Sequence, residues 1–146
     1  MQKPDPEVLA AWTALLMAHR SLTSALDTEL RDGADMSLDE YDVLFQLTIA
    51  DRALSMSELA DSVLITRPTA TRIVDRLVGR GWIDRRDDEL DRRIIRLQLT
   101  ASGRAAQRRA GALHLDGIAR LVGAPLGQHD AAAVAAALEA LVARED

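Results

Sequence analysis

Residues 55–100 constrain the fold most strongly, because the hydrophobic period changes within this short stretch. Ser55 or Ser57 can cap a short helix. After a tight connection Thr66 can cap a second helix, which Gly81 ends. The second helix has one apolar face, formed by Ala70, Ile73, Val74 and Leu77. The stretch is therefore predicted to contain two helices joined by a tight turn, which is a helix-turn-helix.

Two short strands are predicted directly after this helix. The first begins at residues 82–84. In the second, Ile95, Leu97 and Leu99 alternate with polar side chains, which is the pattern of a half-buried strand. Charged residues occupy most of the connection, residues 87–93. The pattern predicts a β-hairpin, placed where a winged helix-turn-helix carries its wing.

A long helix is predicted before this lobe, from Pro6 to about Arg31, with Gly33 at its end. Its apolar residues recur at spacings of four and three, and they are Val8, Trp12, Leu15, Leu22 and Leu26. His19 stands where this series requires one more apolar residue. A seam of this period packs against another long helix, in the same chain or in a second subunit.

Three further helices are predicted from their caps. Ser37 and Glu40 have the spacing of a capping box. Thr100 can cap a helix that runs to about Val122, and Asp130 can cap the last helix. The apolar stripe of the last helix consists of Val134, Leu138 and Leu141. The predicted order is helix, helix, helix-turn-helix, hairpin, helix, helix.

The distribution of charge favours a nucleic-acid partner although the net charge of the chain is −5. Residues 64–110 carry twelve arginines and six acidic residues, so this part has a net charge of +6 and the rest carries −11. A basic segment in an acidic frame orients one face toward DNA and keeps the other faces away from it. The alternative is an arginine-rich surface that only contacts solvent.

Several motifs resemble the MarR family of winged helix-turn-helix regulators. They are Ser57-Glu58-Leu59-Ala60, residues 66–80 followed by Gly81-Trp82-Ile83-Asp84-Arg85, and Asp91-Arg92-Arg93 followed by Leu97-Gln98-Leu99-Thr100 and Gly103. The resemblance covers nearly the whole chain. It implies a homodimer built from the N- and C-terminal helices, with a recognition helix in each major groove. It also implies that Arg93 enters the adjacent minor groove and that Asp91 steadies it.

The expected fold is therefore mainly α: a winged helix-turn-helix with a small two-stranded β-hairpin wing and N- and C-terminal dimerisation helices. We expect a single domain over residues 1–146. Within it, residues 37–100 are expected to form the DNA-binding lobe, and residues 5–32 and 101–145 the dimerisation helices.

The candidate DNA-binding residues lie on the outer face of the second helix of the helix-turn-helix and in the hairpin. They are Thr66, Arg67, Pro68, Thr69, Thr71, Arg72, Arg76, Arg92 and Arg93, and Asp91 is the candidate support of the wing. Arginine reaches guanine edges or phosphates, and threonine reaches bases or phosphate oxygens. The alternative for the helix is that its outer face only contacts solvent. The alternative for Arg93 is an ordinary surface ion pair with Asp91.

The turn of the hairpin departs from the family pattern, because Asp87-Asp88-Glu89-Leu90 stands where a proline is common. An acidic tip repels phosphate. Neutralising Asp88 and Glu89 is therefore expected to tighten DNA binding.

The resemblance further implies a pocket for a small aromatic or phenolic effector between the dimerisation helices and the DNA-binding lobe. The candidate residues are Trp12, His19, Met36, Tyr41, Phe45 and Arg52. The alternative is that these residues belong to the ordinary core and that His19 is a core or interface histidine rather than a sensor of pH or ligand. An effector that prefers a dimer with the wrong spacing between recognition helices would lower DNA affinity.

The residue types argue against several other classes of protein. The chain has no cysteine, its three histidines lie far apart in sequence, and no catalytic constellation stands out, so we expect no enzyme, no cofactor and no metal site. We find neither an apolar run of membrane-spanning length nor a signal segment, so a cytoplasmic protein is expected. Arginine and alanine are abundant, which is the coding bias of a GC-rich genome and favours a bacterial source. The predicted function is a repressor that binds palindromic operators. The alternative is a winged-helix protein-interaction module without specific DNA binding.

Overall fold

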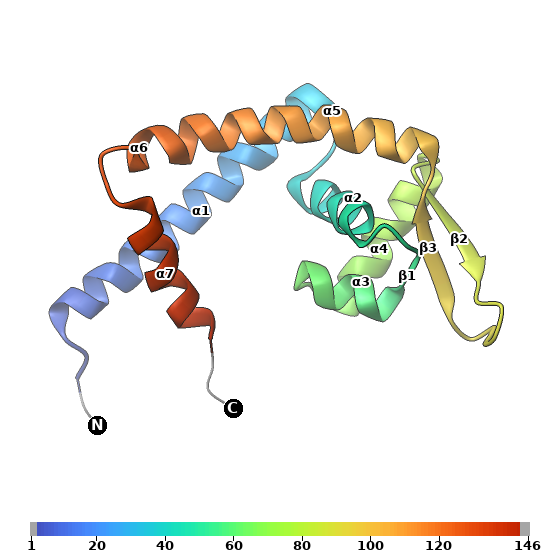
Figure 1. Ribbon diagram of the computed structural model, residues 1–146, viewed down its shortest axis with the longest axis horizontal. Coiled ribbons are helices and arrows are strands. Elements are labelled where there is room, and N and C mark those ends of the chain that lie inside the picture. The colour runs from blue at the N-terminus through green and yellow to red at the C-terminus, as the bar shows by residue number, and fades with distance from the viewer. Residues whose placement is uncertain (1–2, 144–146) are drawn as a thin grey trace.

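The computed structural model describes residues 3–143. The elements are α1 (Pro6–Ala34), α2 (Leu38–Ala50), β1 (Leu54–Ser55), α3 (Met56–Val63), α4 (Arg67–Gly79), β2 (Ile83–Asp87), β3 (Ile95–Leu99), α5 (Ala101–Ile118), a π-helical turn η1 (Ala119–Gly123), α6 (Ala124–Leu126) and α7 (Ala131–Val142). A lobe of α2, α3, α4 and the strands lies at one end of the long helices α1 and α5 (Figure 1). The predicted winged helix-turn-helix fold is confirmed. The ends of the predicted ranges, residues 1–2 and 144–146, lie outside the described residues.

The core of the lobe forms where the apolar faces of its helices meet the inner face of the sheet. Leu44 of α2, Leu59 of α3, Leu77 of α4 and Leu97 of β3 are completely buried. The predicted apolar face of α4 is buried as a whole, so the opposite face of that helix is turned outward. Burial of these side chains removes them from water and holds the helix-turn-helix against the strands.

Local side chains start the helices as predicted. Ser55 and Glu58 form a capping box at α3, so Ser55 and not Ser57 is the cap. Leu64 adopts a left-handed conformation with φ of 57°, which makes the turn between α3 and α4 tight. Thr66 then caps α4 by accepting a hydrogen bond from the backbone N–H of Thr69. The helix-turn-helix is thus determined by residues within one helical turn of each end.

The sheet has three antiparallel strands in the order β1-β3-β2, where two strands were predicted. Leu54 of β1 pairs with Leu97, and Ile83 of β2 pairs with Leu99. The two residues of β1 are too few to show a period in the sequence, and only their pairing with β3 defines them. At the other end of β3, Ile95 is 42% exposed, because here the hairpin extends beyond the helices as the wing.

The end of α1 was predicted wrongly. The helix continues through Gly33 to Ala34, and Asp35 ends it in a left-handed conformation with φ of 52°. A side chain at Gly33 would collide with that of Leu113 on α5. The glycine therefore permits the close approach of α1 and α5 rather than the end of a helix.

The predicted seam of α1 is divided between two environments. Leu26 is buried within the chain, whereas Val8 and Trp12 in the first half are exposed, Trp12 by 56%. None of the helices within residues 3–143 combines the length and the apolar character that a membrane span requires.

Candidate nucleic-acid interface

The outer face of α4 carries the predicted basic and hydroxyl side chains. Its residues Arg67, Pro68, Thr71, Arg72 and Arg76 are exposed, as is the cap Thr66, and Thr69 is half-buried. The hydroxyls of Thr66 and Thr69 lie 2.8 Å apart, so each can use the other as a hydrogen-bond partner. The buried face of the helix therefore fixes a polar, cationic face that points away from the lobe.

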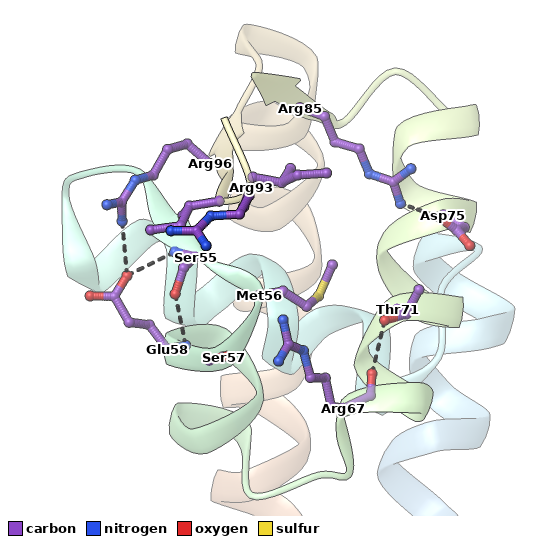
Figure 2. A pocket seen from close by; sticks show the side chains of 12 residues that line it. Ser55, Met56, Ser57, Glu58, Arg67, Thr71, Asp75, Arg85, Arg93 and Arg96 are labelled. Atoms are coloured by element: carbon purple, nitrogen blue, oxygen red, sulfur yellow. Dashed lines mark hydrogen bonds and ion pairs between the residues drawn. The ribbon is translucent and has the colours of Figure 1, made fainter. Parts of the chain in front are cut away.

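A groove of about 640 Å³ separates this helix from the wing. Arg67 and Thr71 of α4 line one part, Arg85 of β2 another, and Arg93 of the wing turn a third (Figure 2). The structure thus brings Arg67 and Thr71 of α4 to the same groove as Arg93, which lies 22 or more positions later in the sequence. Cations along both α4 and the wing suit the two phosphate backbones that flank a DNA groove.

Asp91 holds Arg93 by two parallel hydrogen bonds. The Nε and Nη2 atoms of Arg93 donate to Oδ1 and Oδ2 of Asp91, each over 3.0 Å. These bonds to the Arg93 guanidinium lower the pKa of the Asp91 carboxyl, so the pair is fully charged at neutral pH. The Arg93 side chain is nevertheless 90% exposed. A guanidinium that is held in place and still open to solvent is prepared to enter a narrow, electronegative groove.

The expectation that Asp88 belongs to a free acidic tip is wrong. Its side chain is only 17% exposed. Oδ2 accepts hydrogen bonds from the backbone N–H groups of Leu90 and Asp91, and Oδ1 accepts one from Nε of Arg96 over 2.7 Å. The carboxylate organises the turn, so its neutralisation would loosen the wing. Glu89 remains exposed as expected.

Acidic neighbours reduce the charge of part of the basic face. Nε of Arg76 lies 3.2 Å from Oε1 of Glu40, and Arg85 is paired with Asp75. Within the described part of the chain, Arg67 and Arg72 take part in none of the ion pairs. These two guanidinium groups need no internal contact to be broken before they bind a phosphate or a base.

The six candidate effector residues do not gather in one pocket of this chain. Tyr41 and Phe45 line a pocket of about 690 Å³ between α2 and α5. Met36 is buried in the core, and Arg52 donates to Glu58 on α3. Trp12 and His19 lie on the exposed part of α1.

Sequence reasoning did not select His114, which lies in the same pocket as Tyr41. The ring centroids of Tyr41 and His114 are 4.7 Å apart. Burial lowers the pKa of His114, which favours its neutral form. The pocket is lined on α5 by residues at helical spacing, namely Gln107, Gly111 and His114. This spacing was the sequence signal that could have identified His114.

Comparisons with known proteins agree with this geometry. A family model described as the MarR family matches residues 34–94. The transcriptional repressor MprA of Escherichia coli is 45% identical over 53 residues, which are 36% of this chain and only 30% of that protein. The crystal structure of Sco3205, a MarR family transcriptional regulator from Streptomyces coelicolor in complex with DNA, aligns with a TM-score of 0.86. The two chains are 27% identical, and 97% of this chain and 87% of Sco3205 are covered.

A second structure from Streptomyces coelicolor contains a small molecule. The PcaV transcriptional regulator, in complex with its natural ligand, aligns with a TM-score of 0.68 and 28% identity over 97% of this chain and 94% of that chain. The long flanking helices are therefore part of the likeness, together with the helix-turn-helix and the wing.

Proposed function

Since this chain belongs to the MarR family, we propose that it is a sequence-specific DNA-binding transcriptional regulator, a repressor that binds palindromic operators as a homodimer. The observation that carries the proposal is the outward basic face of α4 beside a wing whose Arg93 is held in place and exposed. This arrangement is suited to the binding of DNA.

In the proposed complex α4 is the recognition helix and enters the major groove. Its contacts come from Thr66, Arg67, Pro68, Thr69, Thr71, Arg72 and Arg76. Arg72, which is exposed and outside the ion pairs, is the proposed reader of a base edge. Arg92 and Arg93 contact the adjacent minor groove, where Asp91 sets the direction of Arg93. The DNA-binding lobe is residues 37–100.

The proposed dimer interface consists of the apolar side chains that the single chain leaves exposed. On α1 and α7 these are Val8, Leu9, Trp12, Leu16, Met17, Leu138, Leu141 and Val142. Exposed apolar surface of this extent is typical of an interface with another chain. Residues 5–32 and 101–145 are accordingly proposed as dimerisation helices within one domain of residues 1–146.

We expect sedimentation to give the mass of a dimer at micromolar concentration. Replacing Leu138 and Leu141 together by Glu places two charges in the proposed interface, which disfavours association because each charge must be desolvated. The double variant is expected to shift toward monomer and to bind a two-half-site operator more weakly. A monomeric mass for the wild type would contradict the proposal.

The effector is proposed to be a small aromatic or phenolic molecule. The apolar pocket beside Tyr41 and Phe45 supports this, as does the ligand-bound structure of PcaV. Because the pocket lies between α2 of the DNA-binding lobe and α5, a ligand there changes how the lobe sits on the dimerisation helices. A ligand that binds more tightly to an arrangement of the dimer that does not fit the operator would lower the affinity for DNA and so release it. The proposed location is the cytoplasm, where the chromosome lies.

The proposed function is tested by selecting genomic fragments on the purified protein and measuring binding to the selected duplex at several salt concentrations. A regulator that neutralises about six phosphates is expected to lose roughly 10³-fold in affinity between 50 and 200 mM salt. It should also prefer the selected palindrome to a scrambled duplex of the same composition. A protein-interaction module is expected to show neither the steep salt dependence nor the preference for the palindrome. The absence of both would therefore refute the proposal.

A further inference from the structure

Two side chains of the hairpin form ion pairs with the helix-turn-helix, Arg85 of β2 with Asp75 on α4 and Arg96 of β3 with Glu58 on α3, and Arg96 also reaches the wing turn. Nε of Arg96 donates to Oδ1 of Asp88 in the wing turn over 2.7 Å. Its Nη1 donates to Oε2 of Glu58 on α3 over 3.3 Å (Figure 2). The guanidinium therefore bridges a carboxylate of the wing and a carboxylate of the helix-turn-helix.

Each end of this bridge is attached to backbone. Oε2 of Glu58 also accepts from the N–H of Ser55 over 2.7 Å, so it is fixed to the start of α3. Asp88 accepts from the N–H of Asp91 over 3.0 Å, and the Asp91 carboxylate holds Arg93. A continuous series of hydrogen bonds thus leads from the cap of α3 to the exposed guanidinium of the wing.

We propose that Arg96 is a positioning residue, which sets the angle of the wing relative to α3 and α4 and thereby aims Arg93 at DNA. The proposal rests on the proposed function and adds to it a residue that need not touch the nucleic acid. Beyond the level of Arg96 the hairpin has little packing support, since Ile95 is exposed and Leu90 at the tip is 98% exposed. Without the bridge, the outer hairpin can twist about the inner part of the sheet.

The bridge needs arginine rather than any cation. Arginine carries several N–H donors in a rigid plane, so it donates to Asp88 and Glu58 at the same time. A lysine ammonium is a single point of charge on a flexible chain and reaches one of the two carboxylates. Hydrogen bonds from Arg96 lower the pKa of the Asp88 carboxyl. Hydrogen bonds from Arg52 and from the backbone N–H of Ser55 lower the pKa of the Glu58 carboxyl to about 2. Both carboxylates are therefore charged at neutral pH.

The test uses affinity for a selected operator and compares Arg96→Gln, Arg96→Lys and the control Arg31→Gln. Arg31 also donates Nε to an aspartate, Asp27, over 2.7 Å, but it lies on α1. We expect Arg96→Gln and Arg96→Lys to lose about tenfold in affinity and Arg31→Gln to lose less than about twofold. If Arg96→Lys bound the operator as tightly as the wild type, the proposal would be overturned. Lysine keeps the positive charge but not the planar guanidinium, so Arg96 would then act through its charge alone.

A double-mutant cycle shows whether Arg96 acts through Arg93. If it does, Arg96→Gln costs little further affinity, less than about twofold, once Arg93→Ala is present. Additive losses would mean an independent contact of Arg96 with DNA and would overturn the proposal.

The position of the wing is also measured without DNA. The chain has no cysteine, so Leu90→Cys introduces a single thiol for a spin label at the tip. Arg96→Gln is expected to increase the mobility of the label and to leave the melting temperature nearly unchanged, because the buried core of the lobe is not altered. An unchanged spectrum overturns the positioning role. If the wild type bound no DNA, the proposed function would fail, while this spectrum would still decide the role of Arg96.

Discussion

Replacing Arg93 by Ala is expected to reduce operator affinity by about 1 to 3 kcal/mol, roughly five- to 150-fold. The side chain is 90% exposed and held by two hydrogen bonds to Asp91, so the wild type loses little side-chain entropy when the guanidinium enters a groove. The loss should be larger on operators with A·T-rich flanks, because narrow A-tract grooves concentrate negative potential. Fluorescence anisotropy at one salt concentration, with two duplexes that differ only in their flanks, measures both effects.

Asp91→Ala provides the comparison for Arg93→Ala. It removes the support and keeps the guanidinium, so affinity should fall in the same direction but by less. Arg31→Ala on α1 controls for the loss of one positive charge far from the wing. If Arg93→Ala bound its operator as tightly as the wild type, the wing would be a passive hairpin and specificity would rest on α4 alone.

Gly103→Ala, at a buried position, is expected to destabilise the fold more than small substitutions on the surface of the lobe. Gly103 lies in the first turn of α5 against the backbone of Trp82. A Cβ there would stand 2.9 Å from the carbonyl carbon of Trp82 and closer still to its oxygen, which also accepts a hydrogen bond from the N–H of Thr100. Backbone must shift to admit the methyl group, at a cost of about 1 to 3 kcal/mol or more. The melting temperature should fall by roughly 3 to 10 °C.

Gly79→Ala is the matched control for this substitution. Gly79 is the last residue of α4, and an added Cβ would meet no atom within 4 Å. Alanine is the better helix former, so this variant should be as stable as the wild type or up to about 1 kcal/mol more stable. Equal melting temperatures for the two variants would contradict the importance of the contact between Gly103 and Trp82.

The sequence by itself determined the helix-turn-helix, the boundaries of most helices and the face of α4 that points outward. The caps Ser37, Thr66, Thr100 and Asp130 each accept a hydrogen bond from a backbone N–H three residues later. Such bonds depend on neighbours in the chain, and so does the apolar period that turns a helix toward the core. The pairing of Asp91 with Arg93 was predictable for the same reason, because the partners lie only two positions apart in the sequence.

Only the tertiary structure decided the features that join distant parts of the chain. The role of Gly33 depends on Leu113, the strand β1 exists by pairing with β3, and Arg96 finds Glu58 across 38 positions of sequence. The candidate effector residues were dispersed for the same reason, since Tyr41 meets His114 of α5 rather than His19 of α1. Contacts of this kind form only when helices and strands pack against each other. The local sequence does not predict which side chains will then face each other.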